Sequence, residues 1–252
     1  MEKIEPQAAV PAPRHVEINL ARLHQMGMVT QDGGRTAVAE DFRIIKRPLL
    51  RSARGEGDTP PLRHGNLIVV TSAMAGEGKT YCAVNLAMSI AMEMDITVLL
   101  VDADVARPSL LKVLGLPPEP GLMDMLLGDK TGLSDLILKT NVPTLSILPS
   151  GRSHKHATEL LASRNMSRLL TEIAERYADR IVIFDSPPLL LTTEASVLAA
   201  QMGQILMVVE AETTTQHAVK EALRHIEHCP HVSLIYNKSK AFPGGEYYGY
   251  YD

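Results

Sequence analysis

Short apolar runs alternate with longer helical patterns from Leu67 to about residue 236. The short runs of Val, Ile and Leu predict strands at 67–71, 96–101, 144–148, 181–184, 204–209 and 232–236. The stretches between them predict helices at 80–92, 158–177, 194–201 and 215–228. Strands without polar alternation are buried on both faces. The repeated β-α units therefore predict an α/β fold with a doubly wound, mostly parallel sheet flanked by helices.

The first 64 residues have a different pattern. Residues 1–15 are rich in Pro and Ala, which predicts disorder. Apolar spacing predicts a short amphipathic helix over 16–26 and a second helix over 37–46, which ends before Pro48. Gly and Pro then mark a linker over 51–64. We expect three parts: a helical N-terminal extension at 1–64, a main domain at 65–240 and a flexible tyrosine-rich tail at 241–252.

The segment Ser72–Thr80 carries the most specific chemical signal. It lies between a predicted strand and a predicted helix, which is the context of a phosphate-binding P-loop, although Ala73 replaces the usual first glycine. Lys79 would reach the β- and γ-phosphates of ATP, and the Thr80 hydroxyl would bind Mg²⁺. The alternative is a glycine-rich turn with a solvated lysine. The expected cofactors are ATP and Mg²⁺, and the candidate nucleotide-binding residues are Ala75, Gly76, Glu77, Gly78, Lys79, Thr80 and Tyr81.

Acidic residues follow two of the predicted strands. Asp102 and Asp104 come directly after the strand at 96–101, and Asp185 follows the strand at 181–184. The carboxyl ends of parallel strands are where an open α/β sheet binds its ligands. An isolated aspartate at a strand end is more often a turn or helix cap. Their combination with a P-loop favours a Mg²⁺-nucleotide site, in which Mg²⁺ takes few carboxylates and keeps several waters.

Composition narrows the function further. The formal net charge of −4 over 252 residues indicates no general nucleic-acid surface. The two cysteines, Cys82 and Cys229, lie far apart without metal-ligand spacing, which favours buried free thiols in a reducing compartment. Neither a membrane-spanning run nor a signal-peptide pattern is found, so we expect a membrane role only through a partner.

Three further motifs make the chain resemble a known family. The segments Val98–Asp104, Glu159–Ser163 and Phe184–Leu189, together with the P-loop, resemble the bacterial tyrosine kinases, a branch of the deviant P-loop ATPases that include septum-site and partition ATPases. In the family an arginine stands two residues after the second aspartate, whereas Arg107 stands three after it. In its stand-alone form the chain resembles the autokinases found beside exosortase and exopolysaccharide-export genes.

The resemblance implies a P-loop NTPase fold and an ATP-dependent protein-tyrosine autokinase that regulates exopolysaccharide synthesis or export. Lys79, Asp102 and Asp104 would be catalytic, with Asp102 accepting the tyrosine proton. Thr80, Asp104 and Asp185 would hold Mg²⁺, directly or through water. The rival interpretation is a partition-ATPase-like assembly switch. Those ATPases carry a signature lysine in the P-loop where this chain has Met74, which favours the kinase.

Other positions acquire expected roles from the same resemblance. Asn237, at the end of the last predicted strand, would contact adenine; the alternative is a strand-ending turn residue. The tail tyrosines would accept phosphate, unless they form an aromatic docking patch: Tyr247, Tyr248, Tyr250 and Tyr251. One helical face would join subunits into a ring, unless it is an ordinary solvated face: Glu40, Arg43 and Lys46.

The resemblance also implies partners and a location. The expected partners are a membrane adaptor of the polysaccharide co-polymerase type, further copies of the chain and a cognate phosphatase. No nucleic-acid partner is expected. We therefore expect a cytoplasmic protein that is held peripherally at the inner face of the membrane by its adaptor.

Overall fold

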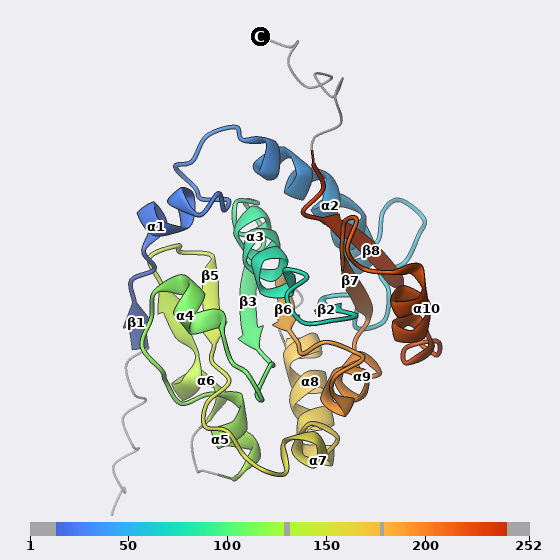
Figure 1. Cartoon of the computed structure of the whole chain (residues 1–252). Coiled ribbons are helices and arrows are strands. Elements are labelled where there is room, and N and C mark those ends of the chain that lie inside the picture. The colour runs from blue at the N-terminus through green and yellow to red at the C-terminus, as the bar shows by residue number, and fades with distance from the viewer. Residues whose placement is uncertain (1–13, 129–131, 177–178, 241–252) are drawn as a thin grey trace, which may run out of the picture.

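A computed structural model describes residues 14–128, 132–176 and 179–240 (Figure 1). In these residues eight strands form one sheet, in the order β1-β4-β5-β3-β6-β2-β7-β8. Only the β4–β5 pair of this sheet is antiparallel. The predicted mostly parallel, doubly wound sheet is confirmed. The strands are β1 (Arg14–Val16), β2 (Leu67–Ser72), β3 (Thr97–Asp102), β4 (Leu138–Thr140), β5 (Leu145–Leu148), β6 (Arg180–Asp185), β7 (Gln204–Glu210) and β8 (Val232–Asn237).

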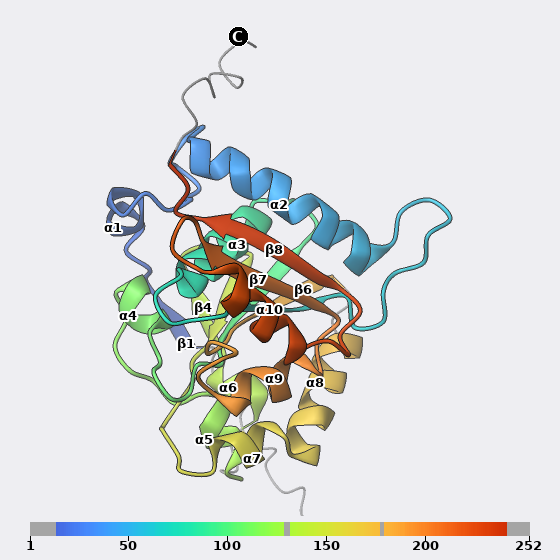
Figure 2. The same ribbon diagram turned by 45° about the vertical axis from the view of Figure 1, so that its right-hand side comes forward.

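Helices cover both faces of the sheet (Figures 1 and 2). They are α1 (Leu20–Gln25), α2 (Ala37–Arg54), α3 (Lys79–Ala91), α4 (Leu110–Leu114), α5 (Leu122–Leu126), α6 (Leu133–Leu136), α7 (Ala157–Leu161), α8 (Arg164–Arg176), α9 (Thr193–Ala199) and α10 (Gln216–Arg224). Helices α1 to α4 pack on one face and α5 to α10 on the other, and each face has its own apolar core. Within β2, Ile68 and Val70 face the first core while Leu67 and Val69 face the second. This two-sided burial explains the continuous apolar runs.

The six predicted strands are all present, but two three-residue strands, β1 and β4, were missed. β1 covers Arg14–Val16, so part of the stretch predicted to be disordered or helical is a strand that pairs with β4. Three-residue strands carry too few positions to show a period of two. The predicted helix at 158–177 is two helices, because the chain breaks at Ala162 and Ser163. The Ser163 hydroxyl accepts a hydrogen bond from the Met166 N–H at 3.2 Å and so starts α8.

The prediction that the second helix ends before Pro48 is wrong. Helix α2 continues through Pro48 to Arg54, and Gly55 ends it with a φ of 75°. Proline lacks the N–H that would bind the carbonyl four residues earlier and costs about 3 kcal/mol within a helix. Leu49 and Leu50 lie directly beyond it and are buried in the same core as Phe42. Their burial offsets that cost.

Within the described residues, the predicted N-terminal extension packs against the predicted main domain. β1 is an edge strand of the sheet, and α2 packs against α3. The boundary at residue 64 and the tail at 241–252 stay predictions, since the tail lies outside the described residues. No helix within the described ranges combines the length and apolarity that a bilayer crossing needs.

Candidate functional site

The P-loop joins β2 to α3 at the carboxyl edge of the sheet, as predicted. Gly76 and Gly78 adopt left-handed φ values of 89° and 97°, which glycine accepts without steric cost. Glu77 is 2% exposed, and its carboxylate accepts a 2.6 Å hydrogen bond from the Met74 N–H. The Thr214 hydroxyl donates to the other carboxylate oxygen of Glu77. The Glu77 carboxylate therefore holds the P-loop backbone in its present conformation and joins it to Thr214.

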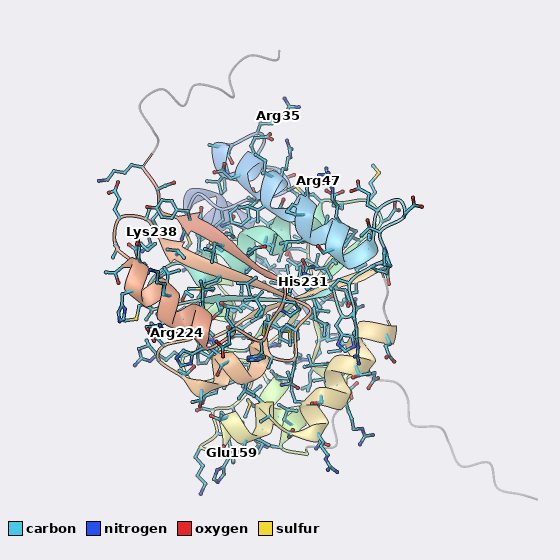
Figure 3. All side chains as sticks on the ribbon, turned by 90° about the vertical axis from the view of Figure 1, so that its right-hand side faces the viewer. Arg35, Arg47, Glu159, Arg224, His231 and Lys238 are labelled. Carbon is cyan, nitrogen blue, oxygen red and sulfur yellow. The ribbon has the colours of Figure 1, made fainter. Side chains whose placement is uncertain are left out.

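The end of β8 holds the loop from the other side. The Asn237 side-chain amide donates to the Glu77 carbonyl at 2.8 Å, and the Lys238 ammonium donates to the Gly76 carbonyl at 2.8 Å. Lys238 also pairs with Glu210 at 3.0 Å, and Figure 3 shows it at the surface beside β8. A Cβ at Gly78 would lie 2.2 Å from Asn237 Nδ2. The predicted adenine contact of Asn237 stays a prediction, while its observed contact is with the P-loop itself.

Lys79 and Thr80 lie at the start of α3, facing the segment that follows β3. The Lys79 ammonium pairs with Asp104 Oδ2 at 2.9 Å. The Thr80 hydroxyl lies 3.1 Å from the Ser109 hydroxyl. Asp104 also accepts a 3.1 Å hydrogen bond from the Arg107 N–H, so the shifted Arg107 contributes its backbone here. Two residues predicted to act on the nucleotide, Lys79 and Asp104, are thus in direct contact.

Asp102 and Asp185 end neighbouring strands and stand opposite each other in the β3–β6 register. Burial and the neighbouring Asp185 charge raise the pKa of Asp102 to about 7. Burial raises the pKa of Asp185 to about 6, while the nearby Lys79 charge opposes that rise. Asp102 Oδ1 and both Asp185 oxygens have no hydrogen-bond partner among the described residues. Such buried, unpaired carboxylate oxygens are costly unless a ligand completes them.

These residues fit Mg²⁺ bound together with phosphates. The available donors are carboxylate and hydroxyl oxygens, which a hard cation prefers. Within the described ranges no group of three or more His, Cys, Asp or Glu is arranged to hold a metal by itself. Mg²⁺ typically takes one or two carboxylates and completes its shell with waters and nucleotide phosphates. The unpaired oxygens of Asp185 and the hydroxyl of Thr80 match that requirement.

Tyr81, predicted to bind nucleotide, faces the N-terminal extension. Its hydroxyl donates to the Gly27 carbonyl at 2.9 Å, and burial raises its pKa. It lines a cavity of 710 Å³ between α2 and β8 that also reaches Gly78 and Asn237. The Tyr81 side chain therefore has a structural role in joining the extension to α3. Ala75 lies in the P-loop, and its contact with the nucleotide stays a prediction.

The predicted assembly residues do not share one exposed face. Glu40 and Arg43 form a 2.5 Å ion pair on α2. Lys46 is instead 3% exposed, because its ammonium donates to the Ser89 carbonyl at 2.5 Å and pairs with Glu93 at 2.7 Å. The prediction that Lys46 takes part in a subunit contact was wrong, because its side chain is buried and its ammonium binds Ser89 and Glu93 of the same chain. Arg47, the next residue, lies at the surface of α2 (Figure 3).

Three contacts were missed by the sequence reasoning. Ser109 approaches Thr80, Thr214 binds Glu77, and Lys238 binds the P-loop backbone. Serine and threonine are common in loops, so neither carried a signal. Lys238 directly follows the candidate Asn237 and could have been suspected from that position. The predicted phosphate acceptors, Tyr247, Tyr248, Tyr250 and Tyr251, lie outside the described residues.

Comparison with known proteins agrees with this geometry. Residues 65–237 match the AAA domain family. The chain is 34% identical over 187 residues to tyrosine-protein kinase YwqD of Bacillus subtilis, which covers 73% of this chain and 76% of that protein. It is 30% identical over 168 residues to tyrosine-protein kinase CpsD of Streptococcus agalactiae, covering 66% and 71%. EpsB of Ralstonia nicotianae is 34% identical over 189 residues, but this chain spans only 24% of it.

Solved structures show the same fold. The kinase domain of Escherichia coli tyrosine kinase ETK superposes with a TM-score of 0.67 at 23% identity, over 88% of this chain and 96% of that one. The chimerical protein CapA2B2 gives a TM-score of 0.67 at 25% identity, over 85% and 96%. A ParA family ATPase from Chlorobium tepidum gives 0.53 at 19% identity, over 69% and 74%. The chain belongs to the bacterial tyrosine-protein kinase family.

Proposed function

We propose that this chain is an ATP-dependent protein-tyrosine autokinase whose acceptors are the tyrosines of its own tail. One observation carries the proposal: a P-loop lysine and three strand-end carboxylates converge, and two of these carboxylates keep unpaired buried oxygens. Phosphoryl transfer needs mainly positioning and charge neutralisation, which such a set supplies. The tail offers four hydroxyls within five residues: Tyr247, Tyr248, Tyr250 and Tyr251.

The nucleotide would be held by the loop amides and by Lys79. The present 2.9 Å pair between Lys79 and Asp104 means that the lysine must turn from this carboxylate toward the β- and γ-phosphates when ATP binds. Thr80, Asp104 and Asp185 would hold Mg²⁺, which neutralises phosphate charge when bound. The hydrogen bonds from Asn237 and Lys238 to the carbonyls of Glu77 and Gly76 would keep the loop amides directed toward the phosphates.

Asp102 is the proposed proton acceptor. In the transfer, the tyrosine oxygen forms a bond to the γ-phosphorus, the bond to the β–γ bridging oxygen breaks, ADP leaves and the phenol proton passes to Asp102. A free tyrosine has a pKa of about 10, so it needs an acceptor. A carboxylate whose pKa is raised toward neutrality is better matched to this task than an ordinary aspartate.

Incubation with γ-labelled ATP tests the proposal. Asp102→Asn should still bind nucleotide while tyrosine labelling falls by about 10²–10⁴-fold. Lys79→Met should lose nucleotide affinity and labelling together. Dephosphorylated protein that hydrolyses ATP but places no label on tyrosine, with an activating adaptor segment present, would contradict the kinase function and favour an ATPase switch.

The four tail tyrosines are tested together by changing Tyr247, Tyr248, Tyr250 and Tyr251 to Phe. Phenylalanine keeps ring size, so the change removes only the hydroxyls. We expect most of the label to disappear while nucleotide binding is kept. Full labelling of this variant would move the acceptor elsewhere. Among described tyrosines Tyr236 is 62% exposed, whereas the Tyr81 hydroxyl is engaged by Gly27.

Assembly and localisation complete the proposal. We infer a ring of identical subunits joined through the α2 surface that carries Glu40, Arg43 and Arg47, so that a tail can enter a neighbouring site. Phosphates of about −1.5 to −2 charges each would repel one another and weaken the ring. Light scattering should give a smaller mass after phosphorylation, and equal masses would refute the coupling.

The cellular setting is proposed by analogy with the family. A membrane adaptor of polysaccharide export would recruit the chain to the inner face of the membrane, and a phosphatase would reset the tail. The regulated process would be exopolysaccharide synthesis or export. Fractionation of the native host with and without the adaptor tests this: the chain should leave the membrane fraction when the adaptor is deleted.

A further inference from the structure

A cavity of 490 Å³ lies between α1 and α4, beside the strand-end acids. The two helices lie next to each other on the same side of the molecule (Figures 1 and 2). Asp102 is one of the residues that line this cavity, and its Oδ1 has no hydrogen-bond partner among the described residues. Pro108, Leu111 and Leu116 give apolar lining. Ser150, which is also buried, is the other polar residue of its inner lining. A cavity of this size with apolar walls and few buried polar groups is suited to an inserted side chain.

The rim of this cavity is positively charged. Arg22 comes from α1 and Lys112 from α4; both are exposed, and neither has an ion-pair partner within the described part of the chain. The acid on the rim, Glu119, is already paired with Arg14. The Arg22 guanidinium lies against the end of α4, because a Cβ at Gly115 would be 3.6 Å from Arg22 Nη1. Two uncompensated cations therefore flank the opening.

We propose that this cavity is the acceptor site, which receives a tyrosine of the tail segment 246–252, and that Arg22 and Lys112 select it by its acidic residues. The inference rests on the proposed function and deepens it by naming how the acceptor is recognised. The segment reads Glu-Tyr-Tyr-Gly-Tyr-Tyr-Asp, so acidic groups at Glu246 and Asp252 bracket the tyrosines. An aromatic ring suits the apolar walls, and its phenol would face Asp102.

The N-terminal extension thereby acquires a function in substrate choice. Arg22 is contributed by a helix that precedes the P-loop in the sequence and makes no part of the nucleotide site. The transfer itself is unchanged: the phenol oxygen gains the γ-phosphoryl group, ADP leaves and Asp102 takes the proton. Arg22 and Lys112 are positioning residues that act on the acceptor and not on ATP.

Acceptor kinetics test this inference with a peptide of sequence Glu-Tyr-Tyr-Gly-Tyr-Tyr-Asp. The enzyme is the variant with four tail Phe residues, so that no internal acceptor competes. Adding Arg22→Gln and Lys112→Gln should raise the peptide KM about five- to tenfold, since two exposed ion pairs are lost, with kcat and ATP affinity within about twofold. The control pair, Lys155→Gln and Arg168→Gln, removes the same charge from the α7–α8 side and should change neither constant.

A second peptide, in which Gln and Asn replace the two acidic residues, completes a double-mutant cycle. Its KM should already be raised and should not respond to the changes at Arg22 and Lys112. The difference in KM between the two peptides should become smaller at 1 M salt, where the Debye length falls to about 3 Å and exposed charges are screened. If the double variant phosphorylates the acidic peptide with an unchanged KM, the acceptor-site inference is wrong while the kinase function stands.

Binding without chemistry separates the two proposals. Fluorescence anisotropy of the labelled acidic peptide measures docking on the same variants in the absence of transfer. Binding that depends on Arg22 and Lys112, without any phosphate transferred by the parent enzyme, would contradict the kinase function and support the docking site. Anisotropy that is equal for the parent, the double variant and the control pair overturns the docking site.

Discussion

Changing Gly78 to alanine should damage the P-loop through two separable effects. Gly78 has a φ of 97°, a left-handed conformation that costs an L-residue about 1–2 kcal/mol. Its new Cβ would also lie 2.2 Å from Asn237 Nδ2, so the amide must move and lose its 2.8 Å bond to the Glu77 carbonyl. Loss of such a bond costs about 0.5–1.5 kcal/mol. We expect the free energy of unfolding to fall by about 2–3 kcal/mol, or the Tm by about 5–10 °C.

A second background separates the two effects. In Asn237→Gly the side chain is absent, so the contact disappears while the backbone strain remains. Gly78→Ala should then cost only about 1–2 kcal/mol. Urea unfolding of the four proteins gives these differences, and titration with a fluorescent nucleotide reports whether the loop still binds. The reasoning is refuted if Gly78→Ala unfolds within about 0.5 kcal/mol of the parent, or if its cost is equal in both backgrounds.

The interior of the protein yields three more predictions. Lys46→Met keeps the buried stem but removes the ammonium bound to Ser89 and Glu93, so urea unfolding should show a loss of about 1–3 kcal/mol, against less than about 0.5 for its exposed neighbour Arg47→Met. Lys46 lowers the pKa of Glu93, so the stability lost in Glu93→Gln should be complete above about pH 5 and vanish as the pH falls through the lowered pKa; a constant difference from pH 3 to 7 would contradict this. Burial raises the pKa of Cys82 to about 12, so native protein should resist alkylation there at pH 8 in mass-spectrometric mapping, whereas the half-buried Cys229 should react first.

Much of the site could be predicted because its chemistry is local in sequence. The P-loop shows its glycines and lysine within one segment, and the strands before Asp102 and Asp185 are continuous apolar runs. Because β3 and β6 pair in parallel, their carboxyl ends lie at the same edge of the sheet, independently of the structure of the chain between them. The buried state of these two acids also follows from their place at the ends of central strands.

Other features depend on contacts that no local pattern records. Pro48 lies within a helix because Leu49 and Leu50 are buried beyond it, in an apolar core that also contains residues of α3 and the sheet. In the sequence Lys46 is one of several charged residues on an amphipathic helix, yet its ammonium forms an ion pair with Glu93, which is 47 residues further along the chain. Likewise, the short strand β1 exists only through β4. Tertiary packing decides each case against the local propensity.

The sheet order has a consequence for how the chain is made. β2, which leads into the P-loop, pairs on one side with β6 and on the other with β7, and both follow it by more than a hundred residues. During synthesis from the N-terminus, the central strand therefore stays unpaired on both edges until most of the chain has left the ribosome. Long-range parallel pairing of this kind is slow and exposes apolar edges to aggregation. Chains that stop before about residue 210 should be insoluble or bound by chaperones, even when they contain the whole P-loop.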